Sequence, residues 1–264
     1  MATFLHLSDL HAVTRGDLCS GVLDTRAILT GAIDRLLEKG DGLGPLDAVL
    51  VTGDVSEDGS PDSYDFARAQ LERFALPIYV VPGNHDARKP MQKAFSGLNI
   101  MPVDGLIDWA DTVDDTRIIG LDTLVEGQGG GRLRLESLDH LERELSGSDG
   151  PFIVMLHHPP FRTGIDFMDV IGLENQSDLA EILAAQSRDI TVLAGHVHGV
   201  HMGRVGGHPA MTAPGLCSGF APDRRAGAPI GFFSGPTGCA VLETGKSGIW
   251  SVVSLDAVEG PYSF

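Results

Sequence analysis

Short apolar runs alternate with longer stretches in which apolar residues recur at helical spacing. The runs are four or five residues long, as is typical of buried strands: Thr3–Leu7, Ala48–Thr52, Ile78–Val81, Arg117–Leu121, Phe152–Leu156 and Thr191–Ala194. Helical spacing is found at residues 24–40, 60–75, 134–145 and 174–186. Ser60-Pro61 is a typical start of a helix and Gly40 a typical end. Strands that alternate with helices predict a layered α/β fold.

The last sixty or so residues follow another pattern. Residues 203–216 and 238–255 are rich in glycine and predict strands and hairpins, which we expect to form a second sheet beside the first. Residues 220–238 show no periodicity of apolar residues and contain many Gly and Pro residues, which predicts a mobile loop near a functional site. We expect a single domain over 1–264. Its hairpin region from about residue 200 onward offers strand edges for a homo-oligomer.

Composition and charge narrow the function classes. The net charge of −17 argues against binding to a nucleic acid polymer, although bound metal cations could still attract small anions. No run of about 18 apolar residues predicts a membrane span, and the start of the sequence does not resemble a signal peptide. The three cysteines form no pairing pattern. We therefore expect a cytoplasmic protein.

Polar residues with metal-binding side chains follow five of the predicted strands. They are Asp9 and His11, then Asp54, then Asn84, His85 and Asp86, then His157 and His158, and finally His196 and His198. In open α/β sheets, ligands bind beyond the carboxyl ends of the strands, where these residues would lie. His196 and His198 are separated by one residue, so extended backbone would point both imidazoles to the same side.

Each segment taken alone has a plainer interpretation. Asp9 and His11 could lie in a surface turn, Gly53-Asp54 is a common loop dipeptide, His157 and His158 could be exposed, and Asn84 and Asp86 could cap the next helix. Because five segments place such residues at the same position, just after a strand, a shared metal site is favoured instead. The ligand types are imidazoles, carboxylates and one amide without a thiolate, which favours Mn, Fe, Zn or Co. Seven ligands are more than one ion needs, so we expect two ions that share a carboxylate.

The ordered motifs D-x-H, G-D, G-N-H-D, H-H-P-P and G-H-x-H, from Asp9 to His198, resemble those of the calcineurin-like metallophosphoesterases. The stretches "GNHDARKPMQKAF", "RIIGLDTLVEGQGGGRL" and "MDVIGLEN" are most similar to the bacterial branch of class III cyclic-nucleotide phosphodiesterases and glycerophosphodiesterases. The resemblance implies a four-layer α/β/β/α sandwich of two mixed β-sheets flanked by helices. It also implies two divalent or mixed-valence metal ions. Asp9, His11 and His198 would hold one ion, Asp54 would bridge, and Asn84, His157 and His196 would complete the second.

The implied reaction is hydrolysis of a small phosphodiester, either a cyclic nucleotide or a glycerophosphodiester, by a metal-bound hydroxide. His85 would stabilise charge or protonate the leaving group. His158 and His201 could support the ligands, and Asp86 could orient an imidazole or cap a helix. The alternatives are a phosphomonoesterase or nucleotide pyrophosphatase with the same metal core, a non-catalytic scaffold, and a nuclease, which the charge disfavours. The natural substrate and the role of Arg88 stay open.

Overall fold

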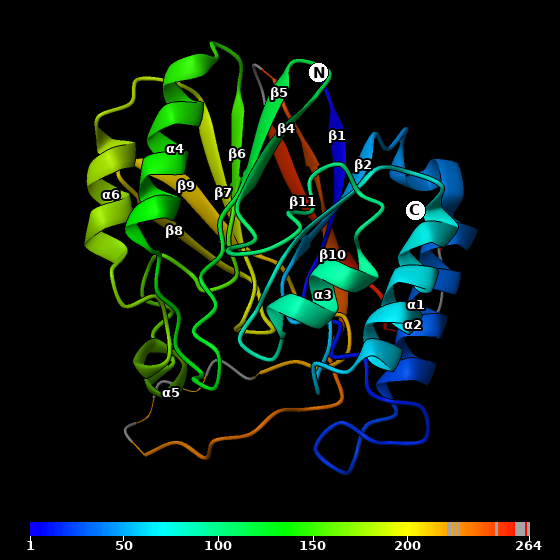
Figure 1. Ribbon diagram of the computed structural model, residues 1–264. Helices are drawn as coiled ribbons and strands as arrows, with labels where there is room; N and C mark the ends of the chain where they lie inside the picture. The colour runs from blue at the N-terminus through cyan, green and yellow to red at the C-terminus, as the bar shows by residue number, and fades with distance from the viewer. Residues whose placement is uncertain (221–222, 224, 226, 246–247, 257–261, 263–264) are drawn as a thin grey trace.

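Two β-sheets face each other at the centre of the molecule (Figure 1). The computed structural model describes residues 1–264 except 221–222, 224, 226, 246–247, 257–261 and 263–264. The first sheet has five strands in the order β11-β10-β1-β2-β3, and the second has six in the order β4-β5-β6-β7-β9-β8. The strands of the first sheet are β1 (Thr3–Leu7), β2 (Ala48–Thr52), β3 (Ile78–Val81), β10 (Gly238–Glu243) and β11 (Ile249–Ser254). Those of the second are β4 (Trp109–Val113), β5 (Thr116–Gly120), β6 (Phe152–Met155), β7 (Ile190–Ala194), β8 (His201–Val205) and β9 (His208–Thr212).

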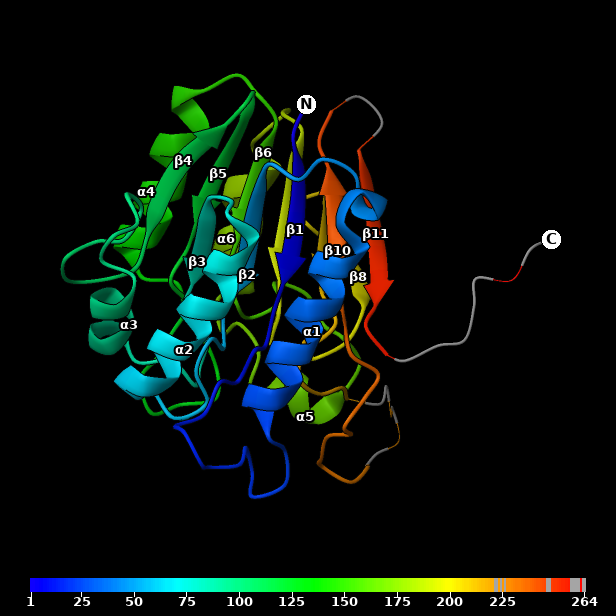
Figure 2. The same ribbon diagram turned by 90° about the vertical axis from the view of Figure 1, so that its right-hand side faces the viewer.

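Parallel strands form the middle of each sheet, and antiparallel strands complete its edges. β1, β2 and β3 are parallel, and so are β5, β6, β7 and β9. β10 pairs antiparallel with β1, β11 with β10, β4 with β5, and β8 with β9. Both sheets are therefore mixed, as expected. Figure 2 shows the carboxyl ends of β1–β3 above the loops that connect them to the helices.

Helices cover the outer face of each sheet. α1 (Thr25–Lys39) and α2 (Pro61–Leu71) lie on the first sheet, while α4 (Leu135–Gly147) and α6 (Gln176–Ala184) lie on the second (Figures 1 and 2). Short 3₁₀ segments follow α1 at Gly40–Leu43 and α2 at Glu72–Phe74. Two further short helices, α3 (Arg88–Ala94) and α5 (Asp166–Val170), follow strands β3 and β6 along the chain. The four layers confirm the expected α/β/β/α sandwich.

Local sequence explains where these elements begin and which sides they bury. Ser60 caps α2 by accepting the Ser63 N–H at 3.2 Å, and Pro61 occupies the first turn, as predicted. On β6, Ile153 and Met155 belong to the core that fills the space between the sheets, whereas Phe152 and Val154 pack with the α4 and α6 residues. Successive side chains of a strand point to opposite faces of the sheet, which explains this alternation. Because both faces of this sheet are covered, the residues on both faces are apolar.

The C-terminal hairpins do not build a sheet of their own, which corrects the expectation of a separate second sheet. β8 and β9 extend the second sheet, and β10 and β11 extend the first. β10 is buried along most of its length because it pairs with β1 on one side and β11 on the other. β11 is an edge strand that exposes Ile249 and Val252, so self-association there stays a prediction that light scattering would test.

β4 and α5 have no counterpart in the sequence prediction, and α3 was expected only as the helix after Asp86, without bounds. Each is short, and β4 is only partly buried, so its polarity does not alternate clearly. Parts of the predicted loop at 220–238 lie outside the described residues, so its mobility is untested. No helix in the described part of the chain is long and apolar enough to cross a membrane.

Candidate metal centre

The polar residues predicted at the strand ends meet at one place between the two sheets. Asp9 and His11 follow β1, Asp54 follows β2 and Asn84 follows β3, all in the first sheet. His157 follows β6, and His196 and His198 follow β7, in the second sheet. All of these except Asn84, which is half-buried, are buried. The site is thus formed by the carboxyl ends of strands from both sheets.

One group of ligand atoms comes from Asp9, His11, Asp54 and His198, whose candidate atoms lie within 4.8 Å of one another. The two Nε2 atoms of His11 and His198 are 3.0 Å apart. His11 Nε2 lies 3.6 Å from Asp54 Oδ2, and His198 Nε2 lies 3.6 Å from Asp9 Oδ1. Two imidazoles and two carboxylates facing one point are a suitable donor set for a divalent ion.

A second group of candidate ligand atoms lies near the same oxygen of Asp54. His157 Nε2 is 3.3 Å from Asp54 Oδ2 and 3.1 Å from Asn84 Oδ1. His196 Nδ1 is 2.9 Å from the same Asn84 oxygen. The two groups therefore share one carboxylate oxygen, Asp54 Oδ2, which lies near both His11 and His157.

The hydrogen bonds on the far side of the imidazoles fix which nitrogen faces the site. His157 Nδ1 donates to the Thr52 carbonyl at 2.7 Å, because a carbonyl can only accept. His11 Nδ1 lies 2.7 Å from Glu57 Oε2. In the neutral rings, both Nε2 atoms then present lone pairs to the site. Metal-binding histidines characteristically have such a partner on the second nitrogen.

These facing acceptors fit cations. His157 Nε2 lies 3.1 Å from Asn84 Oδ1 and 3.3 Å from Asp54 Oδ2, and when the ring is neutral all three atoms are acceptors. Asp9 Oδ2 is buried and has no hydrogen-bond partner among the described residues. Buried acceptors that face one another repel unless a positive centre lies between them. The buried His and Asp clusters are consistent with a dimetal site, although they do not specify the metal.

The backbone at the ligands has an unusual conformation. Among the described residues, eight non-glycine residues have a positive φ, and five of these are in the predicted ligand set: Asp9 (55°), His11 (45°), Asp54 (48°), His196 (72°) and His198 (42°). A left-handed conformation at a residue with a Cβ typically costs about 1–3 kcal/mol. Five such residues at one location indicate that the fold positions their side chains at the expense of backbone stability.

Close packing of the loops also depends on two glycines. A Cβ at Gly83 would lie 2.1 Å from Asp54 Oδ1, and a Cβ at Gly53 would lie 2.4 Å from His157 Nδ1. Gly53 also has a φ of +91°, which favours glycine. The G-D and G-N-H-D motifs therefore need their glycines so that the loops after β2 and β3 can approach Asp54 and His157.

Glu57 is a site residue that the sequence prediction missed. Its Oε2 lies 2.7 Å from His11 Nδ1 and 3.1 Å from His85 Nδ1, so one carboxylate joins a predicted ligand to the predicted catalytic histidine. Burial by itself lowers the pKa of His85, but Glu57 and Asp54 outweigh it and raise that pKa to about 10. The only sequence signal was an acidic residue three positions after Asp54, which is common in loops.

Asp86 has a different set of partners from either of those expected. It accepts the N–H groups of Val55 (3.2 Å), Ser56 (3.0 Å) and Gly83 (2.8 Å), and the Tyr64 hydroxyl at 3.0 Å. The N-cap residue of α3 is Ala87, and no side chain caps that helix. Asp86 therefore ties the loop after β2 to the loop after β3, instead of capping α3 or holding an imidazole.

His158 lies against the cluster, but both of its ring nitrogens have other partners. Nε2 donates to the Gly129 carbonyl at 3.1 Å, so Nδ1 accepts from the Thr123 hydroxyl at 2.8 Å. Its ring centroid is 4.6 Å from that of His196 and 4.9 Å from that of His157. Burial and the nearby His157 lower the pKa of His158 to about 3, which keeps the ring neutral. His201 begins β8 and does not belong to any of the His and Asp clusters found among the described residues.

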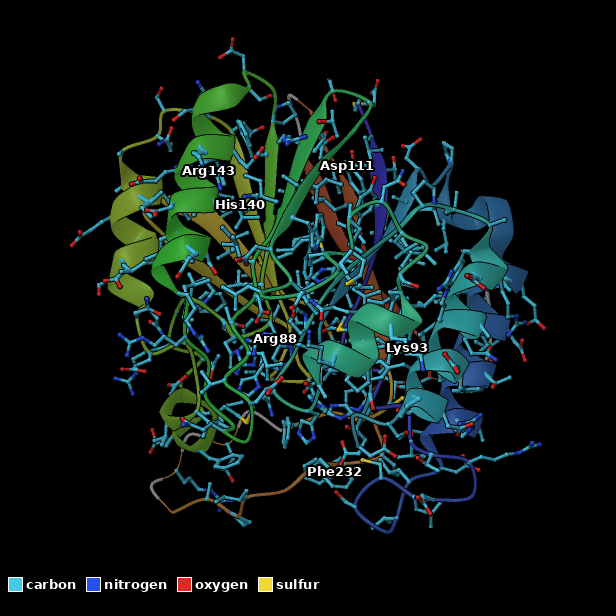
Figure 3. All side chains as sticks on the ribbon, viewed as in Figure 1. Arg88, Lys93, Asp111, His140, Arg143 and Phe232 are labelled. Atoms are coloured by element: carbon cyan, nitrogen blue, oxygen red, sulfur yellow. The ribbon has the colours of Figure 1, made fainter. Side chains whose placement is uncertain are left out.

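Arg88 binds a carboxylate away from the ligand atoms. Its Nε and Nη2 donate to the two oxygens of the buried Asp122, at 2.7 and 2.8 Å. Asp122 lies two residues after the end of β5, so this ion pair joins the start of α3 to the second sheet. Figure 3 shows Arg88 at the start of α3 and, below it, Phe232 on the segment that passes under the strand ends. Phe232 lines a cavity of about 100 Å³ together with His11, His85 and His198, which places the predicted 220–238 loop near the site.

Metal affinity should rise with pH because protons and metal ions compete for this site. Burial lowers the pKa of His157, but Asp54 beside it dominates and raises that pKa to about 9 in the metal-free protein. Below that pKa the ring holds a proton that a metal must displace. We expect the apparent Mn²⁺ affinity of the stripped protein to increase by about tenfold per pH unit per proton released, between pH 6 and 8. Calorimetric titration at several pH values measures this, and a flat profile would contradict it.

Comparison with known proteins agrees with this geometry. Residues 2–200 match the family described as calcineurin-like phosphoesterase. The chain is 33% identical over 219 residues to the 3′,5′-cyclic adenosine monophosphate phosphodiesterase CpdA of Pseudomonas aeruginosa, covering 83% of this chain and 77% of that one. It is 28% identical over 265 residues to a probable glycerophosphodiester phosphodiesterase GpdQ of Arcobacter nitrofigilis, covering 98% and 96%.

The fold is likewise similar to that of solved structures. A dimetal phosphatase from Danio rerio superposes with a TM-score of 0.70 at 14% identity, covering 96% of this chain and 98% of that one. At this identity the likeness concerns the fold alone. With the family match over residues 2–200, the chain belongs to the calcineurin-like metallophosphoesterases.

Proposed function

We propose that the protein hydrolyses small phosphodiesters at a binuclear metal centre. The observation that supports this most directly is the pair of ligand groups that share Asp54 Oδ2. By this proposal Asp9, His11 and His198 hold one ion, and Asn84, His157 and His196 hold the other. The cations, when bound, would neutralise phosphate oxygens and lower the pKa of a water that attacks phosphorus.

The chain's own residues would orient the ligands and manage the proton. Glu57 and the Thr52 carbonyl hold the rings of His11 and His157 with their Nε2 lone pairs toward the site. The Asp54 carboxylate also accepts the His85 N–H at 3.0 Å, which fixes the backbone of the predicted catalytic residue against the bridging ligand.

By this proposal, His85 would give a proton to the leaving group. Its ring centroid is 4.9 Å from that of His11, and its Nδ1 is held by Glu57, so its Nε2 is the nitrogen that can face a substrate. With Glu57 and Asp54 opposing the effect of burial, the raised pKa keeps a proton on the ring at neutral pH. A histidine in contact with the leaving oxygen would then act as general acid.

The relatives favour a diester over a monoester. The proteins from Pseudomonas aeruginosa and Arcobacter nitrofigilis are described as phosphodiesterases, one for cyclic AMP and one, probably, for glycerophosphodiesters. Both substrates are small diesters, which agrees with the acidic net charge because a long polyanion would be repelled.

Elemental analysis and turnover on matched substrates test the proposal. We expect about two metal ions per chain and faster hydrolysis of a diester than of the corresponding monoester or a dinucleotide pyrophosphate. A single ion in the fully active protein would contradict the binuclear centre. Preference for the monoester would assign the same metal centre to a phosphomonoesterase.

A further inference from the structure

A second, larger cavity adjoins the metal centre. Phe220 lines the cavity of about 100 Å³ beside His11 and His198, and its ring centroid is 4.8 Å from that of His198. The same Phe220 also lines a cavity of about 310 Å³. We call this larger space the α5 cavity and define it by Ile165, Phe167, Val170, Phe220 and Ile230. A group attached to a phosphate at the metal centre could therefore reach it past Phe220.

The α5 cavity is lined by residues of α5 and by described residues between Asp223 and Gly231. Both ribbon views place α5 beside the segment around residues 227–235, beneath the strand ends (Figures 1 and 2). Ile165 and Met168 pack with Val197 in a hydrophobic cluster separate from the two main cores. Val197 lies between His196 and His198, so the wall of the cavity is anchored to the loop that bears two proposed ligands.

The walls are apolar and unusually exposed. Val170 is 84% exposed and Ile230 is 69% exposed, although both face the same cavity. Apolar surface of this kind next to an active centre is typical of a ligand subsite, and a volume of about 310 Å³ is in the usual range for one. Phe167 and Phe220 add two aromatic rings that could contact a flat group.

The charges around the cavity restrict the chemistry of its occupant. Asp166 and Asp223 contribute carboxylates. Arg225, the one cationic side chain among the described lining residues, donates from Nε to both oxygens of Asp223, at 2.9 and 3.1 Å. A second phosphate or a carboxylate would therefore meet little free positive charge. A neutral ring that has apolar faces and amino donors at its edge is complementary to this lining.

We propose that the α5 cavity binds the nucleobase of a nucleotide phosphodiester whose phosphate lies at the metal centre. This inference rests on the proposed function and selects nucleotides over glycerophosphodiesters within it. The base would pack against Phe167 and Phe220, and its amino groups would donate to the carboxylates at the rim. Glycerol is too small to cover Val170 and Ile230, so it would leave the apolar wall in water.

Two substitutions at exposed positions test the proposal without disturbing the core: Val170→Asp and Ile230→Asp. Each places a charge where the base would lie. The measurement is the ratio of kcat/KM for 3′,5′-cyclic AMP to that for methyl p-nitrophenyl phosphate, which has no base. We expect the ratio to fall by about tenfold or more, since contact with a base is typically worth that factor. Val103→Asp is the matched control, because Val103 is 95% exposed and lies outside the cavity.

A ratio that does not change, even if both rates fall, would overturn the proposal. A wild-type preference for glycerophosphoethanolamine over cyclic AMP would overturn it as well. Binding provides a second readout. By calorimetry with the metal-loaded protein, AMP should bind about tenfold more tightly than glycerol 3-phosphate, and Val170→Asp should abolish the difference. Equal affinities in the wild type would refute the base subsite. If no diester were hydrolysed, the proposed function would fail, while calorimetry would still decide whether the cavity binds a base.

Discussion

Replacing Asp54 by Asn is expected to lower kcat/KM for a diester by more than about 10³-fold. Asp54 Oδ2 lies 3.6 Å from His11 Nε2 and 3.3 Å from His157 Nε2, so one oxygen serves both ligand groups. Burial alone would raise the pKa of Asp54, but the imidazoles around it, His157 first, hold that pKa well below its usual range. The side chain is therefore ionised at neutral pH. An amide of the same shape removes the charge that the two proposed cations would need, and such preorganised charge is typically the largest catalytic term.

Metal content and folding are measured beside the activity. Asp108→Asn is the matched control, because that half-buried carboxylate accepts the Ser137 hydroxyl and the Asp122 N–H, both at 2.7 Å, and lies outside the ligand groups. The control should keep its metals, whereas Asp54→Asn should lose at least one while its circular dichroism stays native. Activity within tenfold of the wild type, with both ions retained, would show that Asp54 is not the bridge.

The position of the site could be predicted because strand ends leave a clear pattern in the sequence. An apolar run that forms a strand precedes each of Asp54, Asn84 and His157. That these residues lie close together therefore follows from where the strands end. The prediction did not specify that β1–β3 and β6–β7 belong to different sheets. Runs buried on both faces look alike in either sheet, so the pairing of strands is not encoded in local periodicity.

Glu57 and the contacts of Asp86 could not be predicted for a related reason. Glu57 and Asp86 act through contacts between loops that lie far apart in the sequence, such as Glu57 with His85 or Asp86 with Val55. Glu57 belongs to none of the motifs that follow the strands, and Asp86 lies in the G-N-H-D motif but has partners that the motif does not indicate. Their roles depend on tertiary packing around Gly53 and Gly83, where a single Cβ would block the approach of the loops. Likewise, the α5 cavity depends on Phe220 and α5, whose proximity no motif indicates.

The second large effect is expected from His85→Ala, and its size should depend on the leaving group. His85 contacts Glu57 but is not among the proposed ligands, so both metals should remain bound. A ribose or glycerol alkoxide leaves poorly unless it is protonated, whereas a nitrophenolate leaves readily. General acid catalysis is typically worth about 10²–10⁴-fold. We therefore expect a loss of that order on an alkyl diester and a much smaller loss on bis(p-nitrophenyl) phosphate, with kcat/KM measured at matched metal occupancy.

His85→Asn separates proton donation from charge stabilisation. The amide still offers an N–H donor but cannot transfer a proton near neutral pH, so a general acid would be lost as fully as in His85→Ala. If His85 only stabilised the charge on phosphorus, both substrates would slow equally and Asn would restore part of the rate. Loss of metal in either variant would mean that His85, through Glu57 and the Asp54 contact at 3.0 Å, supports the ligands instead. The leaving-group dependence and the Asn variant together thus assign His85 to one of three roles.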